Sequence, residues 1–495
     1  MDSGLAFSWS EWRGLDALAL AELIAWGEVT AVEVAAQATH AASLVTGLGA
    51  VVEVFEDAAE DPASAGAHPG GPLYGVPMFM KDSGSGMSGR LCEWGAPLVR
   101  GQRTTQDSPL TVHLRNAGLN LIGRASLAEF GKAFDSTHRD RDGRLVIVRN
   151  PWNPQRTPGG SSGGSAALVS AAIVPAAKGG DAAGSLRVPA SFTGLVTLKP
   201  TRSLLPLPSG SNELGNHRSQ EGFLTRTVRD QAALLDHTAH PRTRGAFISA
   251  QRPADSFSTR LDQAPAPVRV GLSTGSWGLP GTCCPATVAR IQQVAALLAD
   301  SGHVIEPVDD YDVCAWEPFW THFTTHWIAT AGYWLDHAER HRIPRPELDA
   351  QLLPQNRQLL ALYEELTATE LRRALSANAA LTARTADLFT RIDVLLVPAF
   401  AAPVPMAGGP LALTSDASPA QWLEEFRSAA RYTALGNETG IPCLALPAGT
   451  GPDHMPTGAL LYGRPNSEGL LLRLARLIEL ARPDWFGAAP FPPAG

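Results

Sequence analysis

The sequence predicts an α/β fold, in which strands and helices alternate along the chain. Short apolar runs bounded by turn residues recur between longer segments of helical periodicity, and this alternation is typical of α/β proteins. The chain has 495 residues, enough for two or three average domains or for one large α/β domain. Hydrophobic residues make up 44% of it, so it can bury a sizeable core and is not expected to be disordered.

In the N-terminal part, helices and strands are bounded by recognisable end signals. The capping-box spacing of Thr30 and Glu33 marks the start of the second of two helices expected within 16–46. A loop rich in Pro, Gly, Ala and Asp covers 60–73 and leads to an apolar run at 76–81 that ends in a charge. The other expected elements are a strand at 50–55, a helix at 110–117, a strand at 119–123 and a short helix at 126–131.

Further along, prolines and small residues set the pattern. Three prolines exclude regular structure from 149–158, and the small residues of 165–172 are typical of a buried helix. The region 202–390 is the least informative part of the chain. The other expected elements are buried strands at 268–272, 393–398 and 443–447, an amphipathic helix at 287–301 and helical structure over 355–390.

Charge and cysteine content exclude several classes of function. The net charge of −8 provides no general attraction to nucleic acid or to an anionic membrane, so we expect neither as a partner. The five cysteines form no C-x-x-C pair and are too few and too irregular for a disulfide framework, so we expect reduced thiols. Because the chain shows no signal-peptide pattern and no run of 18 apolar residues, we expect a cytoplasmic protein.

A possible nucleophile and base stand out in the sequence. Two serines preceded by glycine, Ser161 and Ser185, flank a segment of small residues, and Lys81 follows an apolar run. A serine hydroxyl needs a base to become a nucleophile, and a lysine serves as that base only when it is neutral. Its free pKa of about 10.4 must fall by roughly 3 units to work near pH 7, and burial causes such a shift. We therefore expect Lys81 to be shielded from water.

The turn at 181–185 has the composition of an anion-binding nest. Ala182, Ala183 and Gly184 have little side chain to obstruct their backbone N–H groups. Such a nest can hold the oxyanion of a tetrahedral intermediate, which is worth about 3–4 kcal/mol per donor. These three residues are therefore the candidate oxyanion hole.

The segment 159–201, which ends in Gly-Leu-Val-Thr-Leu-Lys-Pro-Thr, resembles the signature segment of the amidase signature family. Members of this family hydrolyse amides with a Ser–cis-Ser–Lys triad, and the 24-residue spacing of the two serines is the family's own. The resemblance implies a single large domain over 1–495, with a mixed, twisted sheet covered by helices on both faces. Its expected parts are a signature core at about 70–205, a variable substrate-pocket region at about 206–390 and a C-terminal core-completing segment at about 391–480.

The resemblance also implies a role for each site residue. Ser185 would be the nucleophile, Ser161 the relay on a cis peptide bond, and Lys81 the terminal base. Asp181 and Arg187 match positions that brace the turn. The expected reaction is hydrolysis of a small-molecule amide through an acyl-enzyme, without metal or cofactor, and homodimer formation stays open.

The signature segment departs from the family pattern at two places. The chain has Asp-Ala-Ala-Gly-Ser at 181–185, where Asp-Thr-Gly-Gly-Ser is more common in the family. This variant is similar to that of members that hydrolyse nylon-type oligomers such as the 6-aminohexanoate cyclic dimer. Lys178 is unusual in a segment that is normally apolar, and we expect it to reach solvent.

Several alternatives compete with this interpretation. Gly-x-Ser-x-Gly at 159–163 also fits the nucleophile elbow of α/β hydrolases, with Ser161 as nucleophile and His454 as base. The same glycines and serines, taken alone, are typical of a flexible linker. A glutamine-amidotransferase-type subunit that supplies ammonia to a partner, an acyl transferase and an esterase are further alternatives on the same site.

The stretch 316–334 is dense in aromatic residues and histidines. Helix-core packing is one interpretation, and lining of the substrate pocket is the other. His322 and His326 are spaced i, i+4 and could bind a metal, but no third ligand is apparent in the sequence, so no metal site is expected. The candidate substrate-binding residues are Trp316, Trp320, Trp327 and Asn437.

Overall fold

The computed structural model describes residues 5–84, 86–207, 218–239, 250–251 and 254–491. Thirteen strands lie in the described part of the chain, eleven of them in one sheet. The strands are β1 (Val51–Val54), β2 (Pro77–Lys81), β3 (Asn120–Ala125), β4 (Thr137–Arg139), β5 (Leu145–Ile147), β6 (Ala176–Asp181), β7 (Val196–Lys199), β8 (Gln220–Thr225), β9 (Arg269–Leu272), β10 (Val304–Pro307), β11 (Val394–Pro398), β12 (Cys443–Thr450) and β13 (Pro456–Gly463).

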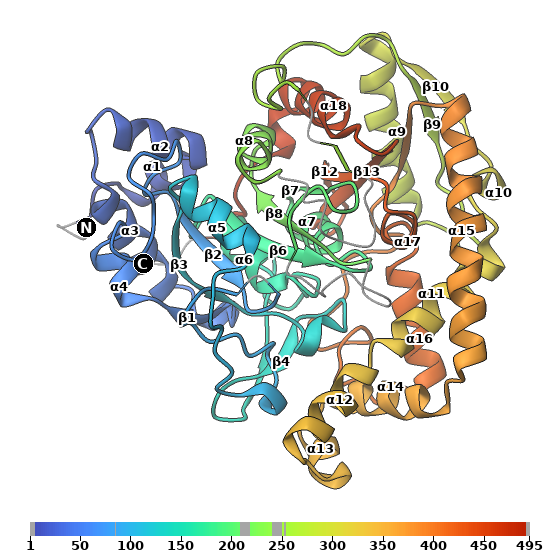
Figure 1. Cartoon of the computed structure of the whole chain (residues 1–495). Coiled ribbons are helices and arrows are strands. Elements are labelled where there is room, and N and C mark those ends of the chain that lie inside the picture. The colour runs from blue at the N-terminus through green and yellow to red at the C-terminus, as the bar shows by residue number, and fades with distance from the viewer. Residues whose placement is uncertain (1–4, 85, 208–217, 240–249, 252–253, 492–495) are drawn as a thin grey trace.

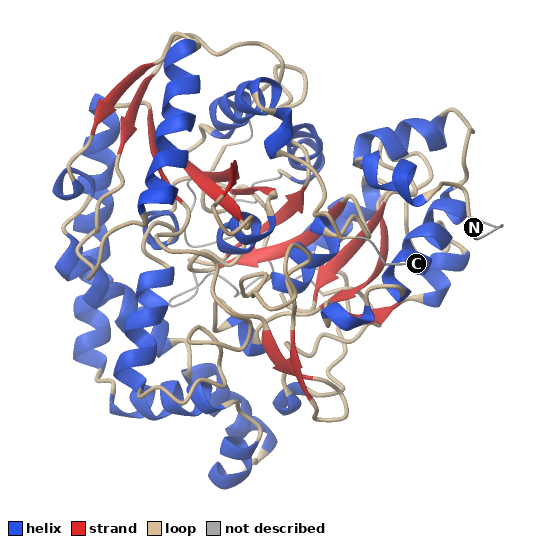
Figure 2. Cartoon of the chain, turned by 180° about the vertical axis from the view of Figure 1, so that it is seen from behind, coloured by secondary structure: helices blue, strands red, loops and turns tan. Residues whose placement is uncertain are grey.

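The large sheet is mixed, and helices flank it (Figures 1 and 2). Its strand order is β1-β3-β2-β6-β8-β7-β12-β13-β11-β9-β10, so strands from both halves of the chain share one sheet. The runs β3-β2-β6 and β11-β9-β10 are parallel, and the strands between them are antiparallel. The predicted fold class is confirmed.

The helices that flank this sheet come from all parts of the described chain. The N-terminal helices are α1 (Trp9–Gly14), α2 (Ala17–Ala25), α3 (Ala31–Ser43), α4 (Glu56–Glu60) and α5 (Pro109–Asn116). The central and later helices are α6 (Gly163–Ser170), α7 (Arg187–Thr193), α8 (Val228–Thr238), α9 (Pro285–Asp300), α10 (Asp310–Val313), α11 (Trp316–Ala329), α12 (Gly332–His341), α13 (Arg345–Ala350), α14 (Pro354–Glu365), α15 (Ala368–Arg391), α16 (Pro419–Ala429), α17 (Ala434–Thr439) and α18 (Glu468–Ala481).

Most expected elements occur where the sequence predicts them. Thr30 caps α3 by accepting a hydrogen bond from the Glu33 N–H, and the Glu33 carboxylate reciprocates, as the capping box requires. The expected helix at 126–131 is wrong in extent, because only one 3₁₀ turn (Glu129–Gly131) forms there. The expected helical stretch at 355–390 is two helices, because the chain is extended at 366–367 between α14 and α15.

One layer of helices comes from the region 202–390, where the sequence pattern is least informative. α11 packs against α14, α15 and α16, and these helices form one end of the molecule (Figure 1). The first helix and the segment after α18 lie close together, since the Arg13 side chain donates to the Ala489 carbonyl. Within the described residues, no helix combines the length and the apolar character needed to cross a bilayer.

Candidate active site

Lys81, the predicted base, is the last residue of β2 and lies in the interior of the sheet. Its side chain is only 5% exposed. Nζ lies 2.8 Å from Ser161 Oγ and 3.0 Å from Ser162 Oγ, and 3.4 Å from the Gly180 carbonyl. The structure therefore brings the predicted base into hydrogen-bond contact with the predicted relay serine, and adds the Ser162 hydroxyl to the same contact.

The Lys81 amine lies where an ammonium ion is disfavoured. Burial lowers the pKa of Lys81 to about 7, and the nearby Lys178 ammonium acts in the same direction. The carboxylates of Glu221 and Asp181 oppose this shift. A large fraction of the molecules therefore holds a neutral amine at pH 7, which is the form that can accept a proton.

Ser161 lies on the loop that leads into α6. The peptide bond between Gly160 and Ser161 is cis, as the resemblance implies. A Cβ on Gly160 would lie 2.5 Å from the Ala133 carbonyl oxygen, so only glycine fits at that position. The Ala128 N–H donates to the Ser161 carbonyl at 3.2 Å. The loop around 128–133 therefore holds Ser161 against Lys81.

Ser185 lies on the tight turn between β6 and α7. Its carbonyl accepts a hydrogen bond from the Ser162 N–H at 3.2 Å, which holds the two serine segments side by side. The preceding Gly184 has φ +136°, and a Cβ there would lie 2.3 Å from Thr433 Oγ1, so the turn requires glycine. No hydrogen bond joins the Ser161 and Ser185 hydroxyls. Among the described residues, Ser185 Oγ has no hydrogen-bond partner.

The three candidate oxyanion donors differ in their surroundings. The Gly184 N–H donates to Asp181 Oδ1 at 2.7 Å and is therefore already used. In the described part of the chain, the N–H groups of Ala182 and Ala183 donate to no protein acceptor. These two groups are the ones available to a substrate oxygen.

An ion pair between Asp181 and Arg187 braces the nucleophile turn. Arg187 Nε and Nη2 donate to the two carboxylate oxygens at 2.9 and 3.0 Å, a bidentate contact between fully buried side chains. Although burial acts to raise it, the Arg187 guanidinium lowers the pKa of Asp181 to about 2. Asn437 completes the brace, since its Nδ2 donates to Asp181 Oδ1 and its Oδ1 accepts from Arg187.

The expectation that Lys178 reaches solvent is wrong. Lys178 is fully buried on β6, and its Nζ lies 2.5 Å from Glu221 Oε2 and 3.2 Å from the Ser83 carbonyl. In the β2–β6 pairing Lys178 is opposite Met80, one residue before Lys81. Because side chains alternate along a strand, Lys178 and Lys81 leave the sheet on opposite faces. The central position of β6 between β2 and β8 explains the burial.

The candidate substrate-binding tryptophans lie on α11 in different surroundings. Trp316 stacks on Trp277 with ring centroids 4.6 Å apart, and Trp320 Nε1 donates to the Trp277 carbonyl at 2.7 Å. Trp327 is buried beside Lys132, whose Nζ is 4.9 Å from the indole centroid. Asn437 is hydrogen-bonded to Asp181 and Arg187, as described above. Of the three tryptophans, only Trp327 lies against a cationic side chain within the described part of the chain.

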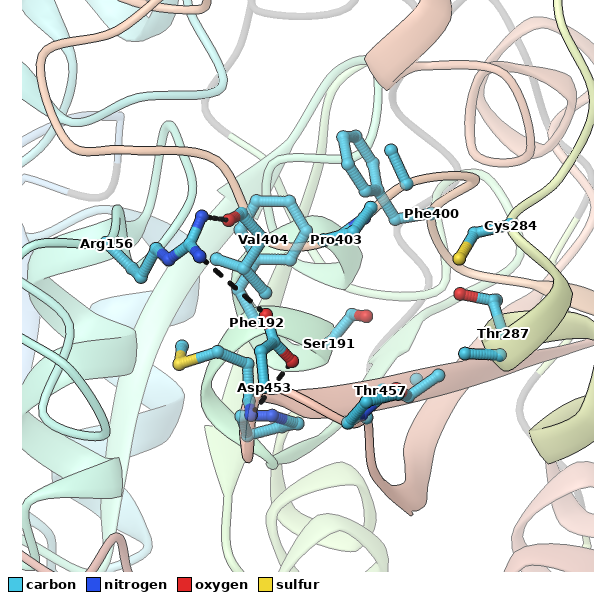
Figure 3. Close-up of a pocket in the computed structure, with 17 residues that line it drawn as sticks. Arg156, Ser191, Phe192, Cys284, Thr287, Phe400, Pro403, Val404, Asp453 and Thr457 are labelled. Carbon is cyan, nitrogen blue, oxygen red and sulfur yellow. Dashed lines mark hydrogen bonds and ion pairs between the residues drawn. The ribbon is translucent and has the colours of Figure 1, made fainter.

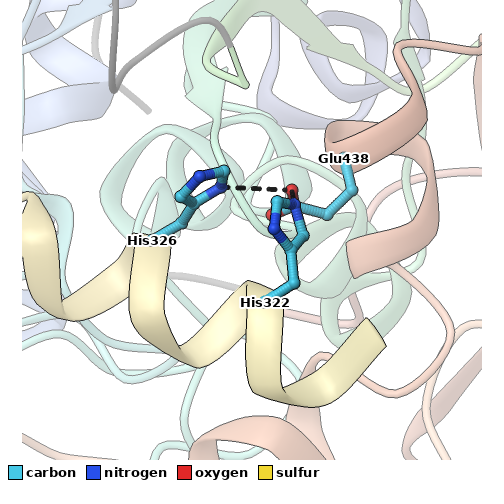
Figure 4. A group of neighbouring side chains, drawn as sticks. All are labelled: His322, His326 and Glu438. Atoms are coloured by element: carbon cyan, nitrogen blue, oxygen red, sulfur yellow. Dashed lines mark hydrogen bonds and ion pairs between the residues drawn. The ribbon is translucent and has the colours of Figure 1, made fainter. Parts of the chain in front are cut away.

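Glu438 lies beside the two histidines of α11, so the expectation that no third possible metal ligand accompanies them is wrong. Glu438 Oε2 lies 2.7 Å from His322 Nε2 and 3.5 Å from His326 Nδ1 (Figure 4). Two histidines and one carboxylate are a set that zinc can use. However, Arg218 already pairs with Glu438 at 2.7 Å, so the buried cluster is balanced in charge without an ion. Glu438 follows Asn437 in the sequence, and no local pattern signals its contact with α11.

The nucleophile-elbow alternative finds no support in the geometry. His454 is exposed on the turn between β12 and β13, whereas the side-chain partner of Ser161 is the Lys81 amine. A cavity of about 290 Å³ lies near that turn (Figure 3). Ser191 and Phe192 of α7 line it together with Phe400, and the triad residues do not.

Comparison with known proteins gives a consistent result. A family model described as Amidase matches residues 33–472. The chain is 32% identical over 472 residues to a putative amidase AmiC of Mycobacterium tuberculosis, and the match covers 95% of each chain. It is 30% identical over 506 residues to a lipoamidase of Enterococcus faecalis, covering 96% of this chain and 64% of that protein.

Solved structures show the same likeness. The chain is similar to 6-aminohexanoate cyclic dimer hydrolase, with a TM-score of 0.87 and 27% identity over 97% of this chain and 99% of that one. It is also similar in fold to a bacterial aryl acylamidase, with a TM-score of 0.83 and 22% identity over 96% of this chain and 97% of that one.

Proposed function

The chain belongs to the amidase signature family, and from the geometry of its site we propose that it hydrolyses a carboxylic amide through a Ser–cis-Ser–Lys triad. The observation that supports this proposal best is the buried Lys81 amine, 2.8 Å from Ser161 Oγ, with its pKa lowered to about 7 by burial. A buried amine in this state can accept a proton through one hydroxyl from another.

In the proposed first half-reaction, Ser185 Oγ attacks the substrate carbonyl. Its proton passes to Ser161 Oγ, and the Ser161 proton passes to Lys81 Nζ. The N–H groups of Ala182 and Ala183, which no protein acceptor in the described part of the chain occupies, hold the oxyanion. The C–N bond then breaks, and the relay returns a proton to the leaving amine.

In the second half-reaction, water attacks the acyl-enzyme with the same relay as base. The oxyanion forms again at the same two donors, and Ser185 leaves with the proton that the relay returns. The hydroxyl-to-hydroxyl contact between Ser161 and Ser185 must close when substrate binds, since such contacts often tighten only in the complex. The hydrogen bond from the Ser162 N–H to the Ser185 carbonyl holds the two serine segments side by side, which supports this step.

The substrate class is the finer part of the proposal. The Ala182–Ala183 pair and the likeness to 6-aminohexanoate cyclic dimer hydrolase make aliphatic and cyclic amides the first compounds to test. The same acyl-enzyme could also arise from an ester or pass its acyl group to an amine.

A screen of amide libraries, read by mass spectrometry, tests the proposal. We expect turnover by the wild type and a loss of several orders of magnitude in kcat in the Ser185→Ala variant. Ser191→Ala, which removes another buried serine outside the triad, is the matched control and should retain activity. A fluorophosphonate should label Ser185. Near-wild-type turnover by Ser185→Ala, or labelling at Ser161 alone, would refute the assignment.

A further inference from the structure

Lysine is rare in this chain, and every copy is buried. The sequence has only four lysines among its 40 Lys and Arg residues, so nearly all surface cations are arginines. The exposed fractions are 5% for Lys81, 8% for Lys132, and 0% for Lys178 and Lys199. Lys81 contacts the relay serine Ser161, and Lys178 pairs with Glu221, but the mechanism assigns nothing to Lys132.

Lys132 is a buried cation without an acidic partner. Within the described residues, no carboxylate oxygen lies within 4 Å of its Nζ, which donates instead to Thr330 Oγ1. Burial lowers the pKa of Lys132 to about 7, and the Arg218 guanidinium acts in the same direction. Arg218 itself pairs with Glu438, so the Glu438 carboxylate is already taken.

The surroundings of Lys132 suit a cation and offer further hydrogen-bond donors. Nζ lies 4.9 Å from the centroid of the Trp327 ring and 5.6 Å from that of Trp334, within the range of cation–π attraction. The indole N–H of Trp327 is buried and has no hydrogen-bond partner in the part of the chain that the structure describes. A buried donor without an acceptor is costly, so a ligand oxygen at this place would be stabilised.

Lys132 also lies beside the catalytic centre. The residue before it, Gly131, lies beside the relay serine, since a Cβ built there would be 3.3 Å from Ser161 Oγ. From this loop the Lys132 side chain extends toward α11 and α12, in the region where the sequence places the substrate pocket. The Lys132 backbone therefore adjoins the residue that lies beside Ser161, and its side chain leads from there to Thr330 at the end of α11.

We propose that Lys132, with the indoles of Trp327 and Trp334, forms an anion-recognition subsite that selects amides carrying a carboxylate away from the scissile bond. This inference rests on the proposed amidase function, because it names the class of amide that the site prefers. A substrate carboxylate would supply the negative charge that the described residues do not place beside Nζ, and would form a charge-assisted hydrogen bond with it.

The test compares pairs of anilides that differ only in one anionic group. The first pair, glutaric acid monoanilide and 5-methylhexananilide, places the carboxylate or its isopropyl isostere on the acyl part. The second pair, 4-butyramidobenzoate and 4-isopropylbutyranilide, places it on the leaving amine. The measured quantity is the ratio of kcat/KM between the two members of each pair, in the wild type and in Lys132→Met and Lys132→Arg.

We expect the wild type to prefer the carboxylate in one of the pairs, with the difference mainly in KM. Lys132→Met should reduce this preference on the order of 10- to 100-fold, the value of one charge-assisted hydrogen bond, and Lys132→Arg should restore part of it. A wild type without preference in either pair, or an unchanged ratio in Lys132→Met, overturns the proposal.

Calorimetric binding to the Ser185→Ala variant separates this proposal from the proposed function. Ser185→Ala should bind the preferred carboxylate compound, and Lys132→Met in that background should bind it at least tenfold more weakly. Binding that depends on Lys132 without turnover by the wild type would refute the hydrolase function but support the subsite. Turnover with the same kcat/KM ratio in the wild type and in Lys132→Met would refute the subsite but not the hydrolase function.

Discussion

Lys81, the proposed base, should destabilise the fold. Lys81→Met abolishes the base, but it also removes an amine that loses its proton when the chain folds. Between the folded pKa of about 7 and the unfolded value of 10.5, the unfolded chain holds more protons. The free energy of unfolding of the wild type therefore rises with pH through this window. Below it, the buried amine lowers that free energy by its full amount. The variant has no such dependence at this position.

The magnitude follows from the pKa shift and the lost contacts. A shift from 10.5 to about 7 corresponds to about 4 kcal/mol of destabilisation at pH 7. The hydrogen bonds from Nζ to Ser161 and Ser162 are lost, at a cost of about 2 kcal/mol together. The net gain for Lys81→Met is about 2 kcal/mol. For a chain of 495 residues this raises Tm by about 2 °C.

Thermal melting of both proteins from pH 6 to pH 10 measures this difference. The advantage of Lys81→Met should be largest at or below pH 7 and shrink by about 1.4 kcal/mol per pH unit above it. Ser185→Ala is the matched control, because it inactivates the enzyme without removing a titratable group. A variant that is less stable than the wild type at pH 7, or a difference that does not change with pH, would refute the claim that Lys81 is buried as a neutral amine.

Three further predictions concern the same site. In a pH profile on an uncharged amide, kcat/KM should rise about tenfold per pH unit below pH 7 and level off above it, because only neutral Lys81 accepts a proton; a profile flat from pH 5 to 9 would contradict this. Lys178→Met should move the rising part of this pH profile to higher pH, and Glu221→Gln should move it to lower pH, because the two charges act on the pKa of Lys81 in opposite directions. Shifts of the same sign in the two variants would contradict the reasoning. Gly184→Ala should lower Tm by a few degrees and kcat by at least tenfold, because the new Cβ would lie 2.3 Å from Thr433 Oγ1, and unchanged melting would show that the turn tolerates a side chain.

Much of the fold and the core of the site could be predicted from the sequence because their signals are local. The capping box at Thr30, the amphipathic pattern of α9 and the apolar run of β11 each lie within one element. The contact of Lys81 with Ser161 depends on a family pattern that spans the two segments, and the sequence contains that pattern.

The rest depends on contacts between segments that no local pattern connects. The central position of β6 buries Lys178, and Glu221 on β8 neutralises its charge there; a lysine among small residues gives no sign of a carboxylate on another strand. Glu438 meets His322 through the packing of α17 near α11, which only the tertiary fold creates. At 126–131 the side chains favour a helix, but the Ala128 N–H donates to the Ser161 carbonyl instead. Only one 3₁₀ turn therefore forms there.

The neutral state of Lys81 depends on how the neighbouring carboxylates are paired. A carboxylate close to a lysine stabilises its charged form, and three of them lie near the end of β2. Each has its own cation: Asp82 pairs with Arg124 at 2.8 Å, Asp181 with Arg187 at 2.9 Å and Glu221 with Lys178 at 2.5 Å. Their fields are largely cancelled, so burial remains the dominant effect on Lys81. Lys178 and Arg187 offset the two carboxylates that act on Lys81, so replacing either cation should raise the pKa of Lys81 and favour its charged form.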